Sequence, residues 1–428
     1  KSIMASSALS LQGPIGVQDN RNRIINGDFN IWQRGITVDI ASTGGNEAGG
    51  DAATGCANSF VADRWRVYAQ ANTTNVSGMT SPTMVVSRRT FDLGLPSGAD
   101  ASSKYYLNIF VGNTTDPSGG EGAGKWHYAG FTAHGNPSTG RGATDGGCFV
   151  ALVQDIEDVR TFENKSCTVS FWAKSDITNQ RVAPVLKQMF AGGTAGGSGV
   201  LIAGSTGHLG HTLDNTWRRY ETSFNVPSIE GQPSLGSSGD DALQLQFVLH
   251  ANSGKAGTGV TFEIGGDLNA GKTGNISFAQ VQLEQGSKVT AFEQRNTRQE
   301  IEDCQYYYQK SYPLVTPAGG ITYDGVRSNL SHTGIGQTFI VPFPTTMRKA
   351  PIARFYNPQT GNQGSMMAGN MTTHVTPTMQ TAWAAGGHPT SESSYHIHIE
   401  NINRGSAAAG TTYYYHYTAD AELSVTTI

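Results

Sequence analysis

The sequence predicts an all-β protein made of two β-sandwiches joined by one short helix. Three observations carry this prediction. Apolar and polar residues alternate over many short runs, turn-forming residues separate the runs, and glycine is abundant, with 54 in 428 residues. Alternation at period two indicates strands with one face on a core. Many short strands divided by turns are typical of sandwiches and barrels.

The clearest strands of the first half each place several apolar residues on one face. These residues are Cys167, Val169, Phe171 and Ala173; then Leu243, Leu245, Phe247 and Leu249; and then Val260, Phe262 and Ile264. The residues between them, such as Gln244 and Gln246, are expected to face water, as in a half-buried antiparallel sheet.

A helical pattern replaces the alternation from Thr297 to Tyr308. Thr297 and Glu300 have the spacing of a capping box. The larger residues that recur at helical spacing are Ile301, Cys304 and Tyr308. Pro313 is expected to stop the helix, because proline cannot continue it.

Strand patterns resume after this helix. The clearest are Thr338 to Phe343, Ile352 to Tyr356, Tyr395 to Ile399 and Tyr413 to Tyr417. The predicted organisation is therefore an N-terminal arm over 1–20, a β-sandwich domain over 21–296, a linker helix over 297–312 and a C-terminal β domain over 313–428.

Charge and hydropathy exclude some classes of partner. Charged residues make up 14% of the chain, the net charge is -4, and no basic run exceeds two residues. Nucleic acid is therefore not an expected partner, because phosphate neutralisation needs clustered cations. No apolar stretch approaches the ~18 residues that span a bilayer, so membrane insertion is not expected. The four widely spaced cysteines are expected to be reduced and mostly buried thiols.

One segment matches the phosphate-binding P-loop pattern. Residues Gly266 to Thr273 read GDLNAGKT. A P-loop needs a strand before it and a helix after it, because the helix N-terminus completes the phosphate cradle. Here a glycine and a second strand pattern follow, from Gly274 to Phe278. We therefore interpret the segment as a hairpin loop and expect no nucleotide or other cofactor.

Two sets of residues are weighed as ligand sites. His396, His398 and Glu400 share one face of a predicted strand. Such a set of side chains can bind a transition metal, or it can simply face solvent. We predict that these three side chains face solvent and bind no metal.

Trp126, His127, Tyr128 and Trp383 lie near glycine-rich segments and are the candidates for contact with a glycan. The alternative is that these aromatic residues anchor loops or a subunit interface.

Catalytic patterns are scarce. The sequence has no G-x-S-x-G elbow and no H-E-x-x-H motif. Asp155, Glu157 and Asp158 lie close together, as do Asp240 and Asp241, but a glycosidase needs two carboxylates that face each other across a sugar. We therefore predict a non-enzymatic protein.

Six segments follow one another along the first part of the chain. They read NRIINGDFNIWQRG from Asn22, ADRW from Ala62, VSFWAKS from Val169, TWRRY from Thr216, VQLEQG from Val281 and CQYYY from Cys304. In this order they resemble bacteriophage tail-fibre and related appendage proteins. The segments around Phe343–Pro344, Met347–Arg348, Ala350–Pro351 and Ala419–Leu423 resemble the small β domain attached in some members.

The resemblance implies a jelly-roll sandwich akin to carbohydrate-binding modules, some of which hold a structural calcium. Asp28 is the position that would serve such a site. Gln280 and Gln282 stand where acidic ligands would be expected, so no metal is predicted.

The function implied is that of a virion structural protein. We expect a homotrimeric tail fibre or appendage, in contact with other virion proteins, that binds a host-surface glycan multivalently. The alternatives are a capsid decoration or head-fibre protein, and a polysaccharide-binding or depolymerising protein.

Overall fold

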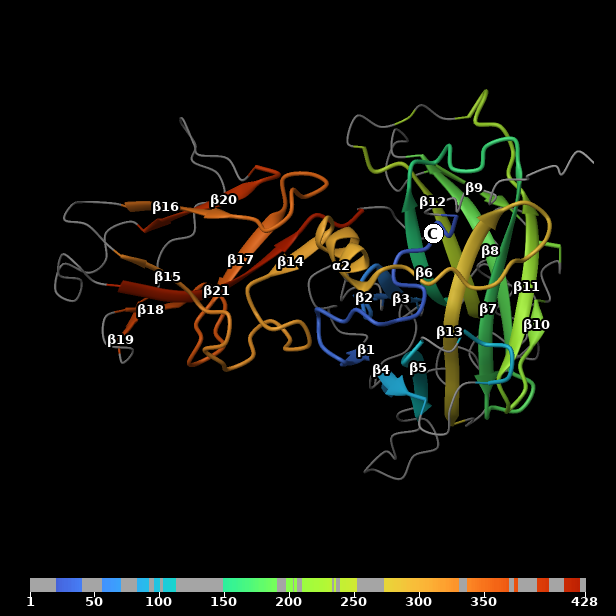
Figure 1. Cartoon of the computed structure of the whole chain (residues 1–428), viewed down its shortest axis with the longest axis horizontal. Helices are drawn as coiled ribbons and strands as arrows, with labels where there is room; N and C mark the ends of the chain where they lie inside the picture. Colours follow the sequence, from blue (N-terminus) through green and yellow to red (C-terminus); the bar gives the residue numbers. More distant parts are fainter. Residues whose placement is uncertain are drawn as a thin grey trace, which may run out of the picture.

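Strands dominate the computed structural model, which Figure 1 shows as two β parts side by side. The structure describes residues 21–40, 56–70, 83–91, 96–100, 103–112, 149–190, 198–202, 204–205, 210–232, 235, 239–251, 273–330, 337–368, 373–375, 391–399 and 412–423. No helix in these ranges is long and apolar enough to cross a membrane.

Two antiparallel sheets build the N-terminal part. The first runs β1 (Thr37–Ile40), β4 (Thr83–Thr90), β5 (Tyr105–Gly112), β13 (Gly274–Gln285), β7 (Ser166–Ser175) and β11 (Arg218–Asn225). The second runs β10 (His211–Thr212), β8 (Arg181–Phe190), β12 (Ala242–Ala251), β6 (Phe149–Glu157), β3 (Trp65–Gln70) and β2 (Cys56–Phe60), with β9 (Ser198–Ile202) beside β8. Successive strands β5, β6, β7 and β8 alternate between the sheets, so the part is a jelly-roll sandwich.

The core lies between these two sheets, where the alternating residues of β7 and β12 meet. Phe171 of β7 and Phe247 of β12 are fully buried, and their ring centroids lie 4.8 Å apart at a steep angle. Rings from opposite sheets in contact show a sandwich, so the predicted apolar faces of these two strands are confirmed. The predicted strand over 260–264 lies outside the described residues.

The other face of β12 is also buried, contrary to expectation. Gln244 and Gln246 are 0% and 3% exposed. The Gln244 Nε2 donates to Asp155 Oδ1 at 2.6 Å, and the Gln246 side chain donates to Gln244. Amides that satisfy one another tolerate burial, so alternation alone did not reveal that this face is covered.

The predicted helix is present as α2 (Thr297–Gln305), but its boundaries differ from the prediction. Asn296, not Thr297, is the N-cap, and its side chain accepts a hydrogen bond from the Arg298 backbone N–H. Glu300 is buried and accepts from the backbone N–H of Asn26 at 2.9 Å. The helix ends before Pro313, because the chain enters a strand at Tyr308.

The C-terminal part is a smaller sandwich around β21 (Thr412–Asp420). Strands β14 (Tyr308–Lys310), β15 (Arg327–Leu330), β17 (Ile352–Tyr356) and β18 (Met366–Ala368) pair with β21, and β19 (Thr373–Val375) pairs with β18. Strands β16 (Gln337–Pro342) and β20 (Ser394–Ile399) form a separate pair. Tyr395 of β20 packs on Tyr417 of β21 at 5.4 Å between ring centroids, so the two layers share a core.

A buried contact, here called the seam, joins the two parts through Arg34, Arg64 and Glu422. The Glu422 carboxylate pairs with both guanidinium groups, and Arg34 lies 3.4 Å from it. The two guanidinium groups stack on the rings of Tyr308 and Tyr307, at 3.7 Å and 3.4 Å from the ring centroids.

The segments that carry the sequence resemblance supply this seam. Arg34 belongs to the segment that begins at Asn22, Arg64 to ADRW, and Tyr307 to CQYYY. The same segments hold the turn beside it, because Asp63 accepts from the Gln33 backbone and side chain at 2.6 and 2.7 Å. These residues therefore hold the two parts together.

Candidate functional site

The predicted glycan-contact residues are not placed by the structure. Trp126, His127, Tyr128 and Trp383 all lie outside the described residues. These four remain predictions.

Two of the predicted metal candidates lie in a described strand. His396 and His398 lie in β20, opposite Ile340 and Thr338 in the register with β16, while Glu400 falls outside the described ranges. Among described residues, no three His, Cys, Asp or Glu side chains are grouped so as to hold a metal ion.

The side chains of Asp28 and of the two glutamines named with it have different hydrogen-bond partners. Its carboxylate accepts from Asn30 Nδ2 and, at 3.1 Å, from Gln294 Nε2. Gln280 instead donates to the Asp100 carbonyl at 2.9 Å, and Gln282 donates to Glu284 at 2.8 Å. The calcium set considered from the resemblance is therefore not assembled.

Asp28 instead belongs to a buried acidic pair with Glu300 of α2. Burial raises the pKa of Asp28. Burial, together with the neighbouring Asp28 carboxyl group, raises the pKa of Glu300 to about 8. Both effects disfavour a charged carboxylate in a low-dielectric site.

The segment that matches the P-loop pattern is followed by a strand. β13 begins at Gly274, directly after Thr273, and runs for 12 residues. A strand therefore follows the motif where a P-loop has a helix, as the sequence predicts, while residues 266–272 themselves lie outside the described residues.

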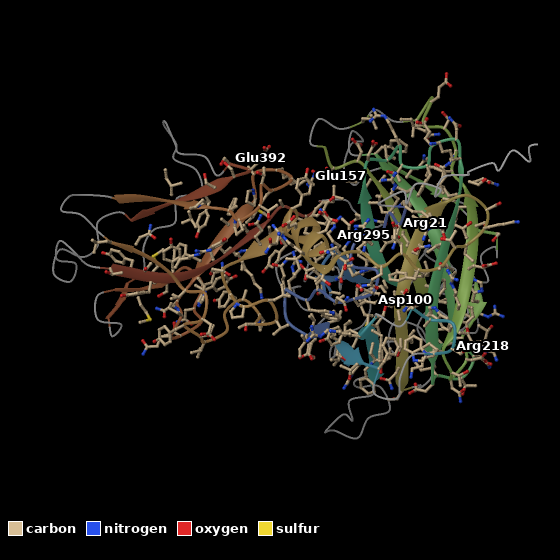
Figure 2. All side chains as sticks on the ribbon, in the orientation of Figure 1. Arg21, Asp100, Glu157, Arg218, Arg295 and Glu392 are labelled. Atoms are coloured by element: carbon tan, nitrogen blue, oxygen red, sulfur yellow. The ribbon has the colours of Figure 1, made fainter. Side chains whose placement is uncertain are left out.

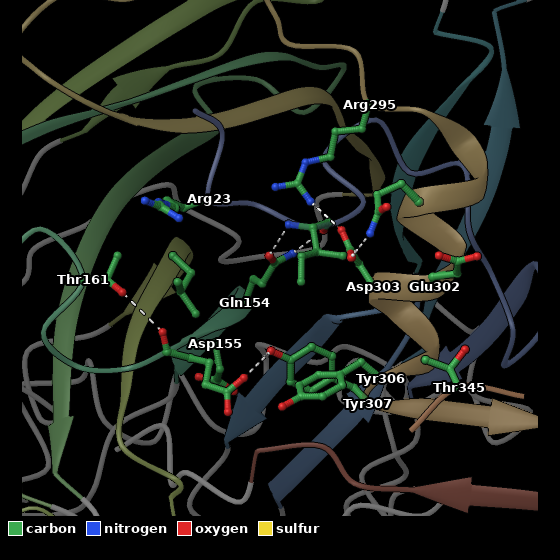
Figure 3. A pocket seen from close by; sticks show the side chains of 14 residues that line it. Arg23, Gln154, Asp155, Thr161, Arg295, Glu302, Asp303, Tyr306, Tyr307 and Thr345 are labelled. Carbon is green, nitrogen blue, oxygen red and sulfur yellow. Dashed lines mark hydrogen bonds and ion pairs between the residues drawn. The ribbon is translucent and has the colours of Figure 1, made fainter. Parts of the chain in front are cut away.

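A hollow of about 530 Å³ lies where α2 meets the end of β6 (Figure 3). Its lining includes Glu157 and Asp303, the second on α2. Tyr307 Oη donates to Glu157 at 2.9 Å, and Arg295 pairs with Asp303 at 3.0 Å.

The other acidic residues around this junction are also paired. Asp155 pairs with Arg66 at 2.9 Å, and Asp240 pairs with Lys349 at 3.0 Å and with Arg348. The Asp240 pairs join the two parts beside the seam, and the Asp155 pair lies within the jelly roll, so both carboxylates have a structural role.

A second hollow, of about 690 Å³, opens on the outward side of the first sheet. Strand alternation decides which side chains reach this outer face. In β7, Ala173 is buried in the core, so Lys174 points outward. In β5, Leu107 is buried in the core, so Tyr106 points outward, and the register pairs Tyr106 with Arg89 of β4.

Three rings form an aromatic patch on the outer face: Phe91, Tyr106 and Trp217. Their centroids lie 5.0 Å (Phe91 to Tyr106), 5.5 Å (Phe91 to Trp217) and 5.2 Å (Tyr106 to Trp217) apart. All three side chains are half-buried, so parts of the rings reach solvent. Such rings present apolar surface beside polar groups.

Three cations, here called the basic rim, surround the patch: Arg88, Arg89 and Lys174. The Lys174 Nζ lies 5.1 Å from the Trp217 ring centroid, and the Arg88 guanidinium lies 4.2 Å from that of Tyr105. Cations over ring faces are held by the ring quadrupole.

Amides and a hydroxyl form the floor beside these groups. The Asn108 Nδ2 donates to Asn275 Oδ1 at 2.9 Å, and the Ser277 Oγ donates to Asn108 Oδ1 at 2.8 Å. This chain of hydrogen bonds fixes the orientation of the floor side chains, so the polar groups of the site are preorganised.

The Trp217 end of the outer face lies away from the C-terminal part. In Figure 2, Arg218, the residue after Trp217, lies at the end of the jelly roll far from Glu392 of the C-terminal part. Sequence reasoning missed this site because its members come from separate strands. The signal in the sequence that could have indicated the site is the position of Lys174 and Trp217, because each lies just beyond the apolar residues of a strand.

Comparison with known proteins gave structural likenesses only. No family model matches the chain, and no curated protein matches it. Among the solved structures that match, the N-terminal cellulose-binding domain of Cellulomonas fimi β-1,4-glucanase C is 12% identical, with 45% of this chain and 88% of that chain covered, at a TM-score of 0.23.

Two further matches show the same low values. The CBM22-1 xylan-binding domain of Paenibacillus barcinonensis Xyn10C is 7% identical, with 60% of this chain and 99% of that chain covered, at a TM-score of 0.22. A cyclase from Fischerella is 9% identical, with 54% of this chain and 87% of that chain covered, at a TM-score of 0.24. At these identities and TM-scores the matches assign no function to this chain.

Proposed function

We propose that this chain is a non-enzymatic protein that binds polysaccharide on the outer face of its jelly roll. The observation that carries the proposal is the outer face itself, where tyrosine rings, cations and oriented amides line one hollow of about 690 Å³. The Trp217 ring packs on Tyr106 beside this hollow, at 5.2 Å between ring centroids. A hollow that combines rings with a few fixed polar groups is the usual form of a small-ligand site.

The chemistry of the face suits a sugar. The rings of Tyr106 and Trp217 offer apolar surface to the C–H faces of a sugar ring. Asn275 is half-buried, and its amide, held in place by Asn108, faces the sugar hydroxyls. A shallow site of this kind binds weakly alone, and several copies on one particle multiply its effect.

A virion is the setting that we propose for this binding, as a homotrimeric tail fibre or appendage. The ordered sequence segments support it, and so does the low charged content of 14%. Capsid decoration is the alternative location, and antibody labelling of intact particles distinguishes the two. Static light scattering is expected to give a trimer, and a monomer at micromolar concentration contradicts that assembly.

Depolymerisation is the enzymatic alternative. Glu157 and Asp303 line the hollow of about 530 Å³ where α2 meets the end of β6. They are already paired with Tyr307 and Arg295. Incubation with polysaccharide is therefore expected to release no reducing ends. Their release would overturn the non-enzymatic part of the proposal.

The binding site is tested by retention of the purified chain on immobilised bacterial, plant and animal polysaccharides. Trp217→Ala and Tyr106→Ala are expected to weaken retention about tenfold, the cost of losing one well-packed aromatic contact. Tyr323→Ala is the matched control, because Tyr323 is a 45% exposed ring in the C-terminal part. Equal loss in the control, or no retention of the unaltered chain, contradicts the proposal.

A further inference from the structure

The outer face carries positive charge that the protein does not neutralise. Three cations, Arg88, Arg89 and Lys174, line its hollow, and Asp176 is the acidic residue there. The whole chain has a net charge of -4. This local excess is therefore opposite in sign to the charge of the molecule.

The contacts of the three cations are with neutral groups. Arg88 stacks on the ring of Tyr105, and the Arg89 Nε donates to the Ser87 hydroxyl at 3.1 Å. Lys174 lies over the rings of Trp217 and Tyr106. Within the described part of the chain, no carboxylate forms an ion pair with any of the three.

The Asp176 carboxylate is hydrogen-bonded to Asn275 and is not paired with these cations. Its two carboxylate oxygens accept from the Asn275 backbone N–H at 2.5 Å and from the Asn275 side chain at 2.8 Å. The carboxylate therefore holds the start of β13. By contrast, the seam arginines Arg34 and Arg64 both pair with Glu422.

We propose that the polysaccharide bound on this face is acidic. This inference rests on the binding function proposed above and names its ligand class. Oxyanion groups of the polysaccharide, carboxylate or sulfate, pair with Arg89 and Lys174 while the sugar rings contact the aromatic patch. Guanidinium groups suit such oxyanions because their N–H donors form paired hydrogen bonds.

The first test compares polymers that differ only in charge. The probes are polygalacturonate, alginate and hyaluronan, each beside its carboxyl-reduced form, and dextran sulfate beside dextran. The full chain is expected to bind an acidic probe at least tenfold more tightly than its neutral counterpart. Binding should weaken between about 20 mM and about 300 mM NaCl, because salt screens exposed charges. Preference within the acidic set distinguishes carboxylate from sulfate.

The second test uses variants. Arg89→Gln and Lys174→Gln are expected to weaken binding of the acidic probe about tenfold more than binding of its neutral counterpart. Arg298→Gln is the matched control, because it removes one positive charge from an 87% exposed side chain on α2.

The outcomes separate the two proposals. Equal binding of acidic and neutral forms, with loss in Trp217→Ala, overturns the acidic ligand and leaves polysaccharide binding in place. Equal loss in Arg298→Gln also overturns it, because the attraction then comes from overall charge. No binding to any probe overturns the proposed function itself.

Discussion

Arginine side chains in this protein occupy two contrasting environments. Some are buried with a carboxylate partner, and others lie on the outer face, where we propose that a ligand binds. Arg64 is 2% exposed and pairs with Glu422, whereas Arg89 is exposed and contacts only a hydroxyl. A buried charge without a partner is costly, so paired arginines mark structure. Sequence alone did not separate these arginines, because the carboxylate partner of Arg64 is 358 positions away in the chain.

Glu300 gives a prediction about pH. Its pKa is raised from 4.5 to about 8, so the folded state retains a proton that the unfolded state releases in this range. The free energy of unfolding is therefore expected to fall as the pH rises from about 5 to about 8. Glu300→Gln should flatten this fall, as measured by thermal unfolding at several pH values.

The control for this prediction is Arg298→Gln on the same helix, which removes no carboxyl group. Its pH dependence should run parallel to that of the unaltered protein. If the Glu300→Gln curve is also parallel, the raised pKa of Glu300 makes no contribution to stability.

At the scale of elements, the sequence predicted correctly which apolar residues of a strand face the core. It did not predict when the opposite, polar face is buried as well. The apolar residues of β7 and β12 lie in the core as expected, because period-two alternation is a local signal. Burial of Gln244 depends on Asp155 of a neighbouring strand, which no local pattern shows. The helix was found, but its cap was assigned one residue late, since both Asn296 and Thr297 are capping residues.

The cap of α2 provides the second prediction. Asn296→Ala removes the side-chain acceptor of the Arg298 N–H, so it is expected to lower the free energy of unfolding by about 1 kcal/mol. Asn296→Asp keeps an acceptor and should cost much less. Urea unfolding measures both, and equal stabilities of the two variants would show that the cap at Asn296 is dispensable.

At the scale of the whole molecule, the seam makes the two sandwiches depend on each other. The all-β class was predictable, because strand patterns lie on both sides of one helical pattern. The outer-face site was not, because Arg89, Tyr106, Lys174 and Trp217 meet only when their strands pair.

The seam gives the third prediction. Glu422→Ala leaves Arg34 and Arg64 buried without this carboxylate, so it should lower the free energy of unfolding by about 3–5 kcal/mol. Calorimetry should show one transition for the unaltered chain and two for the variant. Glu302→Ala, at an exposed pair with Arg298, is the control and should cost less than about 1 kcal/mol. A single, unshifted transition in Glu422→Ala would refute the coupling.

The pairing of Arg64 with Glu422 has a consequence for biosynthesis. The two residues are 358 positions apart in the chain. At about 5–20 residues per second, roughly 20–70 s of translation separate them on the ribosome. From the completion of β13 at Gln285 until Glu422 is made, the nascent jelly roll holds a guanidinium whose counterion has not yet been made. The first sandwich therefore reaches its final stability only after the second has been synthesised.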